Sequence, residues 1–166
     1  MVKESVERTN VIQIGITLSD EKGQMPPETC SWQFNLRYNL EYFSPFIVDR
    51  KECCSQSSID LLLEAGINFE YHKKHGIPAQ LFAEHLTTSG LICSEKLLWV
   101  CFHGIFDFAY LLKLFSGELL LPDNEYSFQE TLKLYFPHSV DLKTLAEPWP
   151  QLQGSLAKLS QDLGVI

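Results

Sequence analysis

The sequence predicts a mixed α/β fold, that is, a sheet of antiparallel and parallel strands with helices packed on it. Three observations support this prediction. A β-branched run opens the chain, an alternating apolar and polar run follows it, and from Ser57 onward helical patterns alternate with short apolar runs. The chain has 166 residues, of which 45% are hydrophobic and 20% charged, so we expect one globular domain with a sizeable core.

The first two runs predict an antiparallel pair of strands. Residues 11–18 form a β-branched apolar run, and the Asp-Glu-Lys-Gly sequence at 20–23 supplies turn residues after it. Residues 31–36 then alternate between polar and apolar, so every second side chain falls on the same face of a strand. We expect three side chains of this second strand to face the core, namely Trp32, Phe34 and Leu36.

Two helices are predicted in the middle of the chain, after a stretch without periodicity at residues 41–56 that indicates a long loop. The first helix begins at a serine cap, Ser57, and ends at Gly66. The second begins at Pro78, because proline fits the first turn of a helix, and ends near Gly90. His85 lies on the apolar stripe of this helix and is expected to be a core or boundary histidine.

The second half of the chain predicts a strand, a sharp turn and a helix in direct succession. Residues 97–102 form a continuous apolar run, which is typical of a central strand buried on both faces. Residues 103–115 follow at once with apolar positions three and four apart, as in a helix. A further helix starting after Asn124, a short strand at 139–142 and a last helix at 151–163 complete the prediction.

Charge, hydropathy and cysteine content limit the classes of function. There are 13 Lys and Arg against 21 Asp and Glu, a net charge of −8, which excludes a broadly basic surface for nucleic acids or anionic membranes. No apolar run approaches the roughly 20 residues of a membrane span, and the first residues do not resemble a signal peptide, so we expect an intracellular protein without a membrane partner. Five cysteines, an odd number, are expected to be reduced and mostly buried thiols.

Four histidine and aspartate residues are considered as candidates for chemistry. His72 and His75 flank two lysines, a pattern that favours a solvated charge run over a metal pair. Asp107 follows the buried strand and falls in the first turn of the next helix. It is either a metal-binding carboxylate at the carboxyl end of a strand or a helix N-terminal residue that stabilises the helix dipole. Asp141, after the apolar Val140, has a similar position and a weaker case.

The order and spacing of several motifs resemble one family from Asn10 to Val165. This is the Caf/Pop-type poly(A) deadenylase, the DEDD-class, RNase D-like exoribonuclease subunit of the Ccr-Not complex. The resemblance implies an RNase H-like mixed sheet with flanking helices, and residues 42–54 look like an insertion in it. The segments that carry the resemblance are residues 11–18, 26–27, 31–35, 58–62, 65–69, 82–84, 99–103, 107–111, 135–137 and 141–143.

The resemblance also implies a chemistry, phosphodiester hydrolysis by two divalent metal ions, Mg²⁺ or Mn²⁺, held by four acidic residues. One family motif reads His-Ser-Gly-Tyr-Asp, and its Asp is a metal ligand. Residues 103–107 read His-Gly-Ile-Phe-Asp, so Asp107 is the expected catalytic metal ligand and His103 a candidate substrate contact. The resemblance supplies no other family ligand in this sequence.

The remaining family motifs are expected outside these residues. The Asp-x-Glu strand would precede Val11, and the His-Gln-Ala-Gly-Ser-Asp run, which supplies the general base and the fourth carboxylate, would begin just after Val165. The sequence therefore looks truncated at both ends, lacking the first strand and the C-terminal helices. Residues 11–18 would then carry an unpaired apolar edge, and we expect the 166-residue chain to be inactive as a nuclease and marginally stable.

Two functions from different classes follow. The first is a 3'-5' exoribonuclease that shortens poly(A) tails in messenger RNA turnover, with poly(A) RNA, the Not scaffold and Ccr-type deadenylase subunits as partners, in nucleus and cytoplasm. The second is a non-catalytic, degenerate paralogue that acts as a binding subunit of the same complex; an unrelated α/β domain is a third, weaker alternative. A local basic lip for RNA would draw on Lys73, Lys74 and Lys113.

Overall fold

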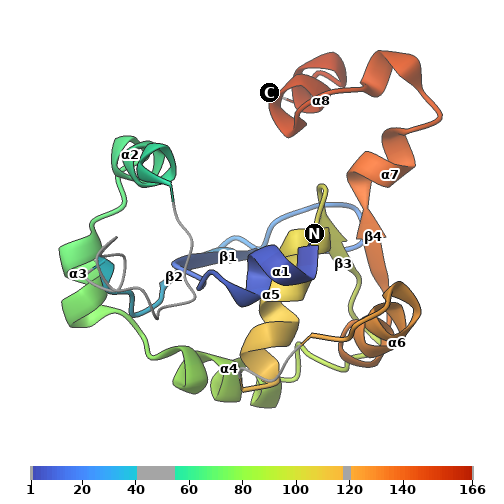
Figure 1. Ribbon diagram of the computed structural model, residues 1–166. Coiled ribbons are helices and arrows are strands. Elements are labelled where there is room, and N and C mark those ends of the chain that lie inside the picture. The colour runs from blue at the N-terminus through green and yellow to red at the C-terminus, as the bar shows by residue number, and fades with distance from the viewer. Residues whose placement is uncertain (1, 41–54, 118–120, 166) are drawn as a thin grey trace. The chain divides into compact units, whose positions relative to one another are not determined.

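The computed structural model describes residues 2–40, 55–117 and 121–165 (Figure 1). The predicted insertion at residues 42–54 lies outside these ranges. The chain divides into two compact units, one of Glu4–His85 and one of Leu86–Ile166 together with Met1–Lys3. Within the described ranges, no helix is both long and apolar enough to cross a membrane.

The predicted antiparallel pair is confirmed in the first unit. Strand β1 (Gln13–Thr17) pairs with strand β2 (Ser31–Asn35) so that Gly15 lies opposite Gln33. The connection between them closes on Asp20, whose carboxylate accepts the backbone N–H groups of Lys22 and Gln24, both at 2.8 Å. The turn chemistry and the β-branched run thus form the hairpin that their sequence indicates.

The core face of β2 is only partly as predicted. Leu36, directly after the strand, is fully buried, and the half-buried Phe34 packs against the ring of Phe82 with centroids 5.1 Å apart. Trp32, however, is 39% exposed. Burial decreases toward the start of β2, where Ser31 is exposed as well, so the prediction that Trp32 faces the core is wrong.

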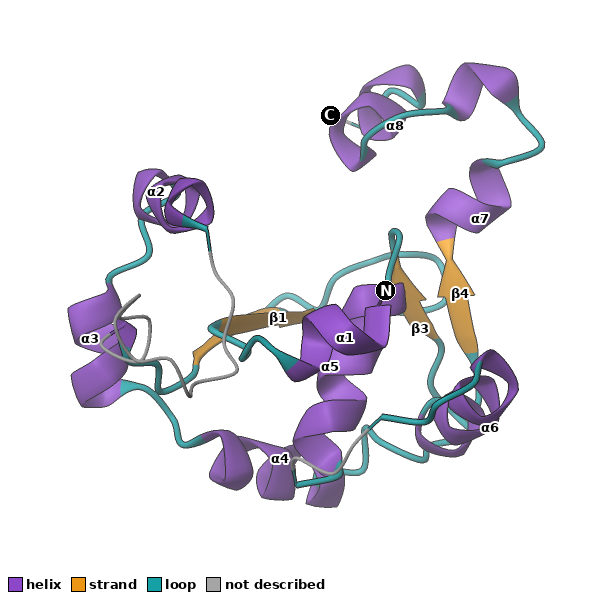
Figure 2. Cartoon of the chain, in the orientation of Figure 1, coloured by secondary structure: helices purple, strands orange, loops and turns teal. Residues whose placement is uncertain are grey.

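The helices associated with the first unit include both predicted ones (Figure 2). Helix α1 spans Val2–Glu7, α2 spans Gln56–Glu64, α3 spans Phe69–His75 and α4 spans Ala79–Thr88. The serine cap of α2 is Ser55 rather than Ser57, and α4 begins after Pro78 as predicted. Helices α1 and α3 were not predicted.

Helix α3 corrects the interpretation of the histidines as a charge run. The side chain of Asn68 caps the helix by accepting the N–H of Tyr71 at 2.9 Å. His72 is 2% exposed, and its Nδ1 lies 3.1 Å from the backbone oxygen of Leu36. His72 is therefore a buried structural residue that ties α3 to the end of β2, whereas His75 is exposed.

The second unit contains a parallel strand pair. Strand β3 (Trp99–Cys101) lies beside strand β4 (Ser139–Asp141), with Trp99 opposite Ser139 and Cys101 opposite Asp141 (Figure 1). Helices α5 (Ile105–Phe115) and α6 (Glu125–Tyr135) connect them, as the sequence predicts. Burial of β3 on both faces is a wrong prediction: Val100 is 56% exposed, and among the described residues β3 pairs with β4 alone.

An aromatic cluster forms the core of this unit. Phe136, which is 1% exposed, packs against Trp99 at a centroid distance of 5.0 Å and against Phe108 at 4.9 Å. Phe115 completes the cluster, with its ring 6.1 Å from that of Phe136. The cluster therefore fastens α5 to the strand before it and to the end of α6.

The end of the chain is divided into shorter elements than predicted. Helix α7 (Leu142–Ala146) follows β4 directly, and a 3-10 turn spans Pro150–Leu152. Gly154 adopts φ 132°, which interrupts the helical pattern, and Ser155 then caps α8 (Leu156–Asp162). The single helix expected at 151–163 is thus a turn followed by a short helix.

Two expectations about individual side chains are also corrected. His85, expected in the core or at its boundary, is exposed. Of the three described cysteines, all free thiols, Cys93 is exposed while Cys30 and Cys101 are half-buried, so the prediction of mostly buried thiols is wrong for the described part of the chain.

Candidate functional site

The candidate site lies at the carboxyl ends of β3 and β4. These strands run parallel, so their last residues, Cys101 and Asp141, end at the same edge (Figure 1). The chain leaves β3 through His103 and Gly104 and enters α5, which carries Asp107 in its first turn. The carboxyl ends of parallel strands are where open α/β sheets place their ligands, so the topology brings the predicted residues to the expected edge.

The turn between β3 and α5 is tight. His103 has φ 60°, a left-handed conformation in which histidine is found more often than most residues but which costs free energy. Gly104 is buried, and a Cβ atom there would lie 2.3 Å from the Cys101 Sγ and 2.6 Å from the Cys101 Cβ. The glycine at 104, where the family motif has serine, is therefore required by the Cys101 side chain beneath it.

Asp141 binds this turn through its carboxylate. Its Oδ1 accepts the N–H of His103 at 2.8 Å and that of Lys143 at 2.9 Å, and its Oδ2 accepts the N–H of Gly104 at 3.0 Å. Burial acts to raise the pKa of the Asp141 carboxyl, but backbone N–H donors, with that of Thr144 among them, outweigh burial and hold this pKa below its usual value. The backbone N–H groups thus stabilise the ionised form of the Asp141 side chain.

Asp107 has a different environment. Its side chain is exposed, and no hydrogen bond to its carboxylate is found among the residues that the structure describes. Partial burial raises the pKa of Asp107, the negative charge of Asp141 raises it further, and His103 opposes both. A carboxylate with free oxygens beside a second negative charge is a suitable ligand for a divalent cation.

Two further groups line the same edge. The Nζ of Lys143 lies 3.3 Å from the Nδ1 of the exposed His103, so the predicted substrate contact is accessible and has a cation beside it. The Cys101 Sγ donates to the backbone oxygen of Val140 at 3.5 Å. Burial, followed by the charge of Asp141, raises the pKa of the Cys101 thiol, which therefore stays protonated and is a poor nucleophile.

The described residues do not by themselves make a two-metal site. No group of three or more His, Cys, Asp or Glu in the described ranges is arranged to hold a metal ion. Asp107 could supply one carboxylate of a metal site. Both carboxylate oxygens of Asp141 already accept hydrogen bonds from backbone N–H groups.

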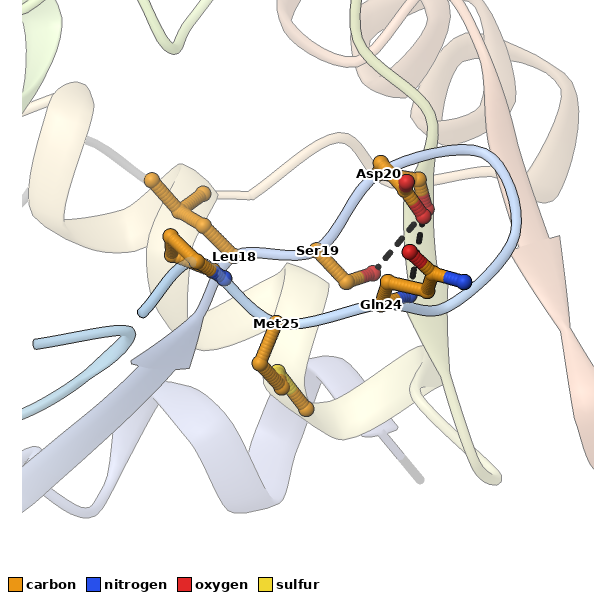
Figure 3. Close-up of a pocket in the computed structure, with 6 residues that line it drawn as sticks. Leu18, Ser19, Asp20, Gln24 and Met25 are labelled. Atoms are coloured by element: carbon orange, nitrogen blue, oxygen red, sulfur yellow. Dashed lines mark hydrogen bonds between the residues drawn. The ribbon is translucent and has the colours of Figure 1, made fainter. Parts of the chain in front are cut away.

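A shallow pocket elsewhere is unrelated to these residues. It is formed within the connection between β1 and β2 by Leu18, Ser19, Asp20, Gln24, Met25 and Pro26 (Figure 3). Its one carboxylate, that of Asp20, serves the turn, since it accepts the N–H of Gln24. None of the candidates for chemistry, namely His72, His75, His103, Asp107 and Asp141, lines this pocket.

Sequence reasoning selected Asp107 and His103, which the structure places at this edge, but missed the backbone contacts of Asp141. Asp141 was considered only as a weaker metal carboxylate. The sequence Asp-Leu-Lys-Thr at 141–144 is typical of a helix N-cap, and Asp141 does cap α7. That pattern could have revealed its role as the cap of α7. Its hydrogen bonds to His103 and Gly104 depend on the register of β3 against β4, which the pattern does not show.

The chain is similar to known ribonucleases over most of its length. The model of the CAF1 family ribonucleases matches residues 1–87 and 86–163. Poly(A) ribonuclease pop2 of Schizosaccharomyces pombe is 36% identical over 164 residues, which are 99% of this chain and 46% of pop2. The chain thus spans about half the length of the curated relatives it matches.

Two solved structures show the same fold. S. pombe Pop2p in its Mg²⁺ and Mn²⁺ bound form has a TM-score of 0.88 and 36% identity, covering 99% of this chain and 62% of that chain. A yeast CAF1 structure co-crystallised with the NOT1 MIF4G domain has a TM-score of 0.81 and 29% identity, covering 98% of this chain and 60% of that chain. These matches confirm the predicted mixed α/β, RNase H-like fold class.

Proposed function

Because this chain belongs to the CAF1 family of ribonucleases, we propose that its protein is a 3'-5' exoribonuclease that shortens the poly(A) tails of messenger RNA. The proposal is supported by a 36% identical relative that is a poly(A) ribonuclease. It is also supported by the position of Asp107, which occupies the aspartate of the family motif at the carboxyl end of a strand. The substrate in this proposal is poly(A) RNA, and the cellular locations are the nucleus and the cytoplasm.

The observation that carries the proposal is the open carboxylate of Asp107. It lies at the edge shared by two parallel strands, without a hydrogen-bond donor among the described residues. The exposed His103 is close enough to act on its charge, and the ammonium of Lys143 lies beside the His103 ring. In the complete family site, Asp107 would hold a Mg²⁺ or Mn²⁺ ion together with three other acidic residues. Such ions stabilise the attacking and leaving oxygens of phosphodiester hydrolysis.

We further propose that the 166-residue chain by itself is inactive as a nuclease. Asp141 cannot serve as a second open carboxylate without giving up its bonds to the β3–α5 turn. A single aspartate does not hold a hydrated Mg²⁺ ion tightly enough to assemble a two-metal site.

An assay with labelled oligo(A) and Mg²⁺ or Mn²⁺ tests both parts of the proposal. We expect no shortening by the 166-residue chain. A polypeptide that also carries the family's Asp-x-Glu and His-Gln-Ala-Gly-Ser-Asp motifs should shorten oligo(A), and Asp107→Ala should abolish that activity. Robust shortening by the 166-residue chain that Asp107→Ala removes would contradict its proposed inactivity. Activity of the longer polypeptide that survives Asp107→Ala would contradict the role of Asp107.

A second candidate function is a non-catalytic binding subunit of the Ccr-Not complex. It is favoured by the match to a CAF1 structure that was co-crystallised with the NOT1 MIF4G domain. Isothermal titration of the 166-residue chain with a NOT1 MIF4G domain tests it. Binding without nuclease activity in any longer product supports this function, and absence of binding by a folded chain argues against it. Ccr-type deadenylase subunits are the other partners of the proposal.

A further inference from the structure

We propose that Asp141 is a positioning residue, which fixes the His103–Gly104 turn to the end of β4 and thereby sets the direction in which α5 presents Asp107. Asp141 is not itself a metal ligand in this proposal. The role of Asp107 as a metal ligand rests on the proposed function. The hydrogen bonds of Asp141 are observed independently of that function.

The carboxylate of Asp141 joins two parts of the chain that are distant in sequence. One set of bonds is local, because the N–H of Lys143 belongs to the first turn of α7, which Asp141 caps. The other set reaches back 38 and 37 residues to the N–H groups of His103 and Gly104. A residue that served only as a helix cap would make the first set and not the second.

The turn lacks a local means of holding its shape. The N-cap residue of α5 is Gly104, which has no side chain and so makes no capping hydrogen bond. His103 beside it is held at φ 60°, a conformation that a free chain rarely adopts. The two N–H groups at this point are the ones that Asp141 accepts, so a strand 38 residues away supplies the cap that the turn itself does not.

The placement of Asp107 follows from this turn. Asp107 is three residues after Gly104, in the first helical turn of α5. Phe108, directly after it, is buried and donates its N–H to the oxygen of Gly104 at 2.9 Å. A rotation of the Gly104 backbone therefore changes the direction of the first turn and of the Asp107 carboxylate on it.

Direct ligation by Asp141 would conflict with these bonds. Each carboxylate oxygen already accepts at least one backbone N–H, at 2.8 to 3.0 Å. An ion that took these lone pairs would leave the turn without its acceptor. The two aspartates at this edge therefore have separate roles, one toward the backbone and one toward the ligand.

Amide exchange with water, measured by NMR on the ¹⁵N-labelled 166-residue chain, tests the proposal. In Asp141→Ala we expect exchange at the His103 and Gly104 amides to become at least tenfold faster and the amide signals of residues 105–108 to shift. Asn124→Ala is the matched control, since Asn124 caps α6 in the same unit by accepting the N–H of Ser127 at 2.8 Å. That control should leave the signals of residues 103–108 unchanged.

Asp141→Asn keeps the proposal testable if the alanine variant does not fold. Its amide oxygen can replace Oδ1, which accepts from His103, while its NH₂ group would face the N–H of Gly104. Exchange at Gly104 should therefore accelerate while exchange at His103 stays within twofold. Unchanged exchange at both amides in either variant, or an equal effect of Asn124→Ala, would overturn the proposal. No metal ion or RNA is present, so a failed nuclease assay and a failed exchange experiment are separate results.

Discussion

Replacing Gly104 with alanine should destabilise the second unit, by an amount set by the Cys101 side chain. The new Cβ would lie 2.3 Å from the Cys101 Sγ and 2.6 Å from its Cβ, whereas non-bonded carbon atoms prefer about 3.5–4.0 Å. The Sγ can rotate away, but the Cβ is fixed to β3, so the turn itself must shift by about 1 Å. Overpacking of this kind costs about 1–3 kcal/mol in the free energy of unfolding.

Urea unfolding followed by tryptophan fluorescence and circular dichroism measures this loss, because Trp99 lies on β3. With a typical slope of 1–3 kcal/mol per molar urea, a loss of about 2 kcal/mol moves the midpoint down by about 1 M. Gly15→Ala is the control, since a Cβ at Gly15 would meet nothing within 4 Å, and its effect should stay within about 0.5 kcal/mol.

A double-mutant cycle tests the cause. Cys101→Gly removes both the Sγ and the Cβ that a new Cβ at position 104 would meet, so Gly104→Ala should cost less in that background than in the natural chain. Gly104→Ser, which restores the residue of the family motif, should destabilise in the same direction as Gly104→Ala. If Gly104→Ala leaves the midpoint unchanged, or costs as much in the Cys101→Gly background, the steric argument for glycine at this turn is refuted.

Three further predictions concern the same unit. Phe136→Ala should lower the free energy of unfolding by about 3–5 kcal/mol, because it empties the centre of a buried aromatic cluster; a drop below about 1 kcal/mol in urea unfolding would contradict this. His103→Val should cost about 1–2 kcal/mol and His103→Gly much less, because β-branched residues tolerate φ 60° poorly; equal midpoints for the two would count against backbone strain. The raised pKa of Asp107 means that the folded chain binds its proton more readily than the unfolded chain, so its ionised form lowers stability above that pKa. Asp107→Asn should therefore raise the urea midpoint slightly at pH 7 and not at pH 3, and a lowered midpoint at pH 7 would show the opposite sign.

Sequence patterns correctly predicted the helices and strands that are determined by interactions between neighbouring residues. The β-branched run of β1 and the strand, turn and helix that place Asp107 depend on residues next to one another, and each lies where the sequence predicts it. The cap of α6 by Asn124 is of the same kind. The position of Asp107 could therefore be found without a structure, although the expectation that it holds a metal ion came from the family resemblance.

Features that depend on distant backbone atoms could not be predicted in this way. The burial of His72 depends on a polar contact between its ring Nδ1 and the backbone oxygen of Leu36, 36 residues earlier. The lysines next to His72 made its segment look like an exposed charge run rather than a helix. The bonds from Asp141 to the β3–α5 turn depend on the register of β3 against β4. Val100 is exposed because of which other segments pack against β3. A short apolar run in the sequence does not show which segments those are.

The parallel pairing of β3 and β4 has a consequence for the order in which the chain folds. The hairpin of β1 and β2 closes a short connection, whereas the bond between His103 and Asp141 closes a loop of 38 residues. Contacts between residues far apart in sequence form more slowly, because the loop must lose its freedom before the contact stabilises it. During synthesis, the turn that carries Asp107 remains without its acceptor until residue 141 has left the ribosome. The edge that carries Asp107 is therefore completed late, after the helices that connect its two strands.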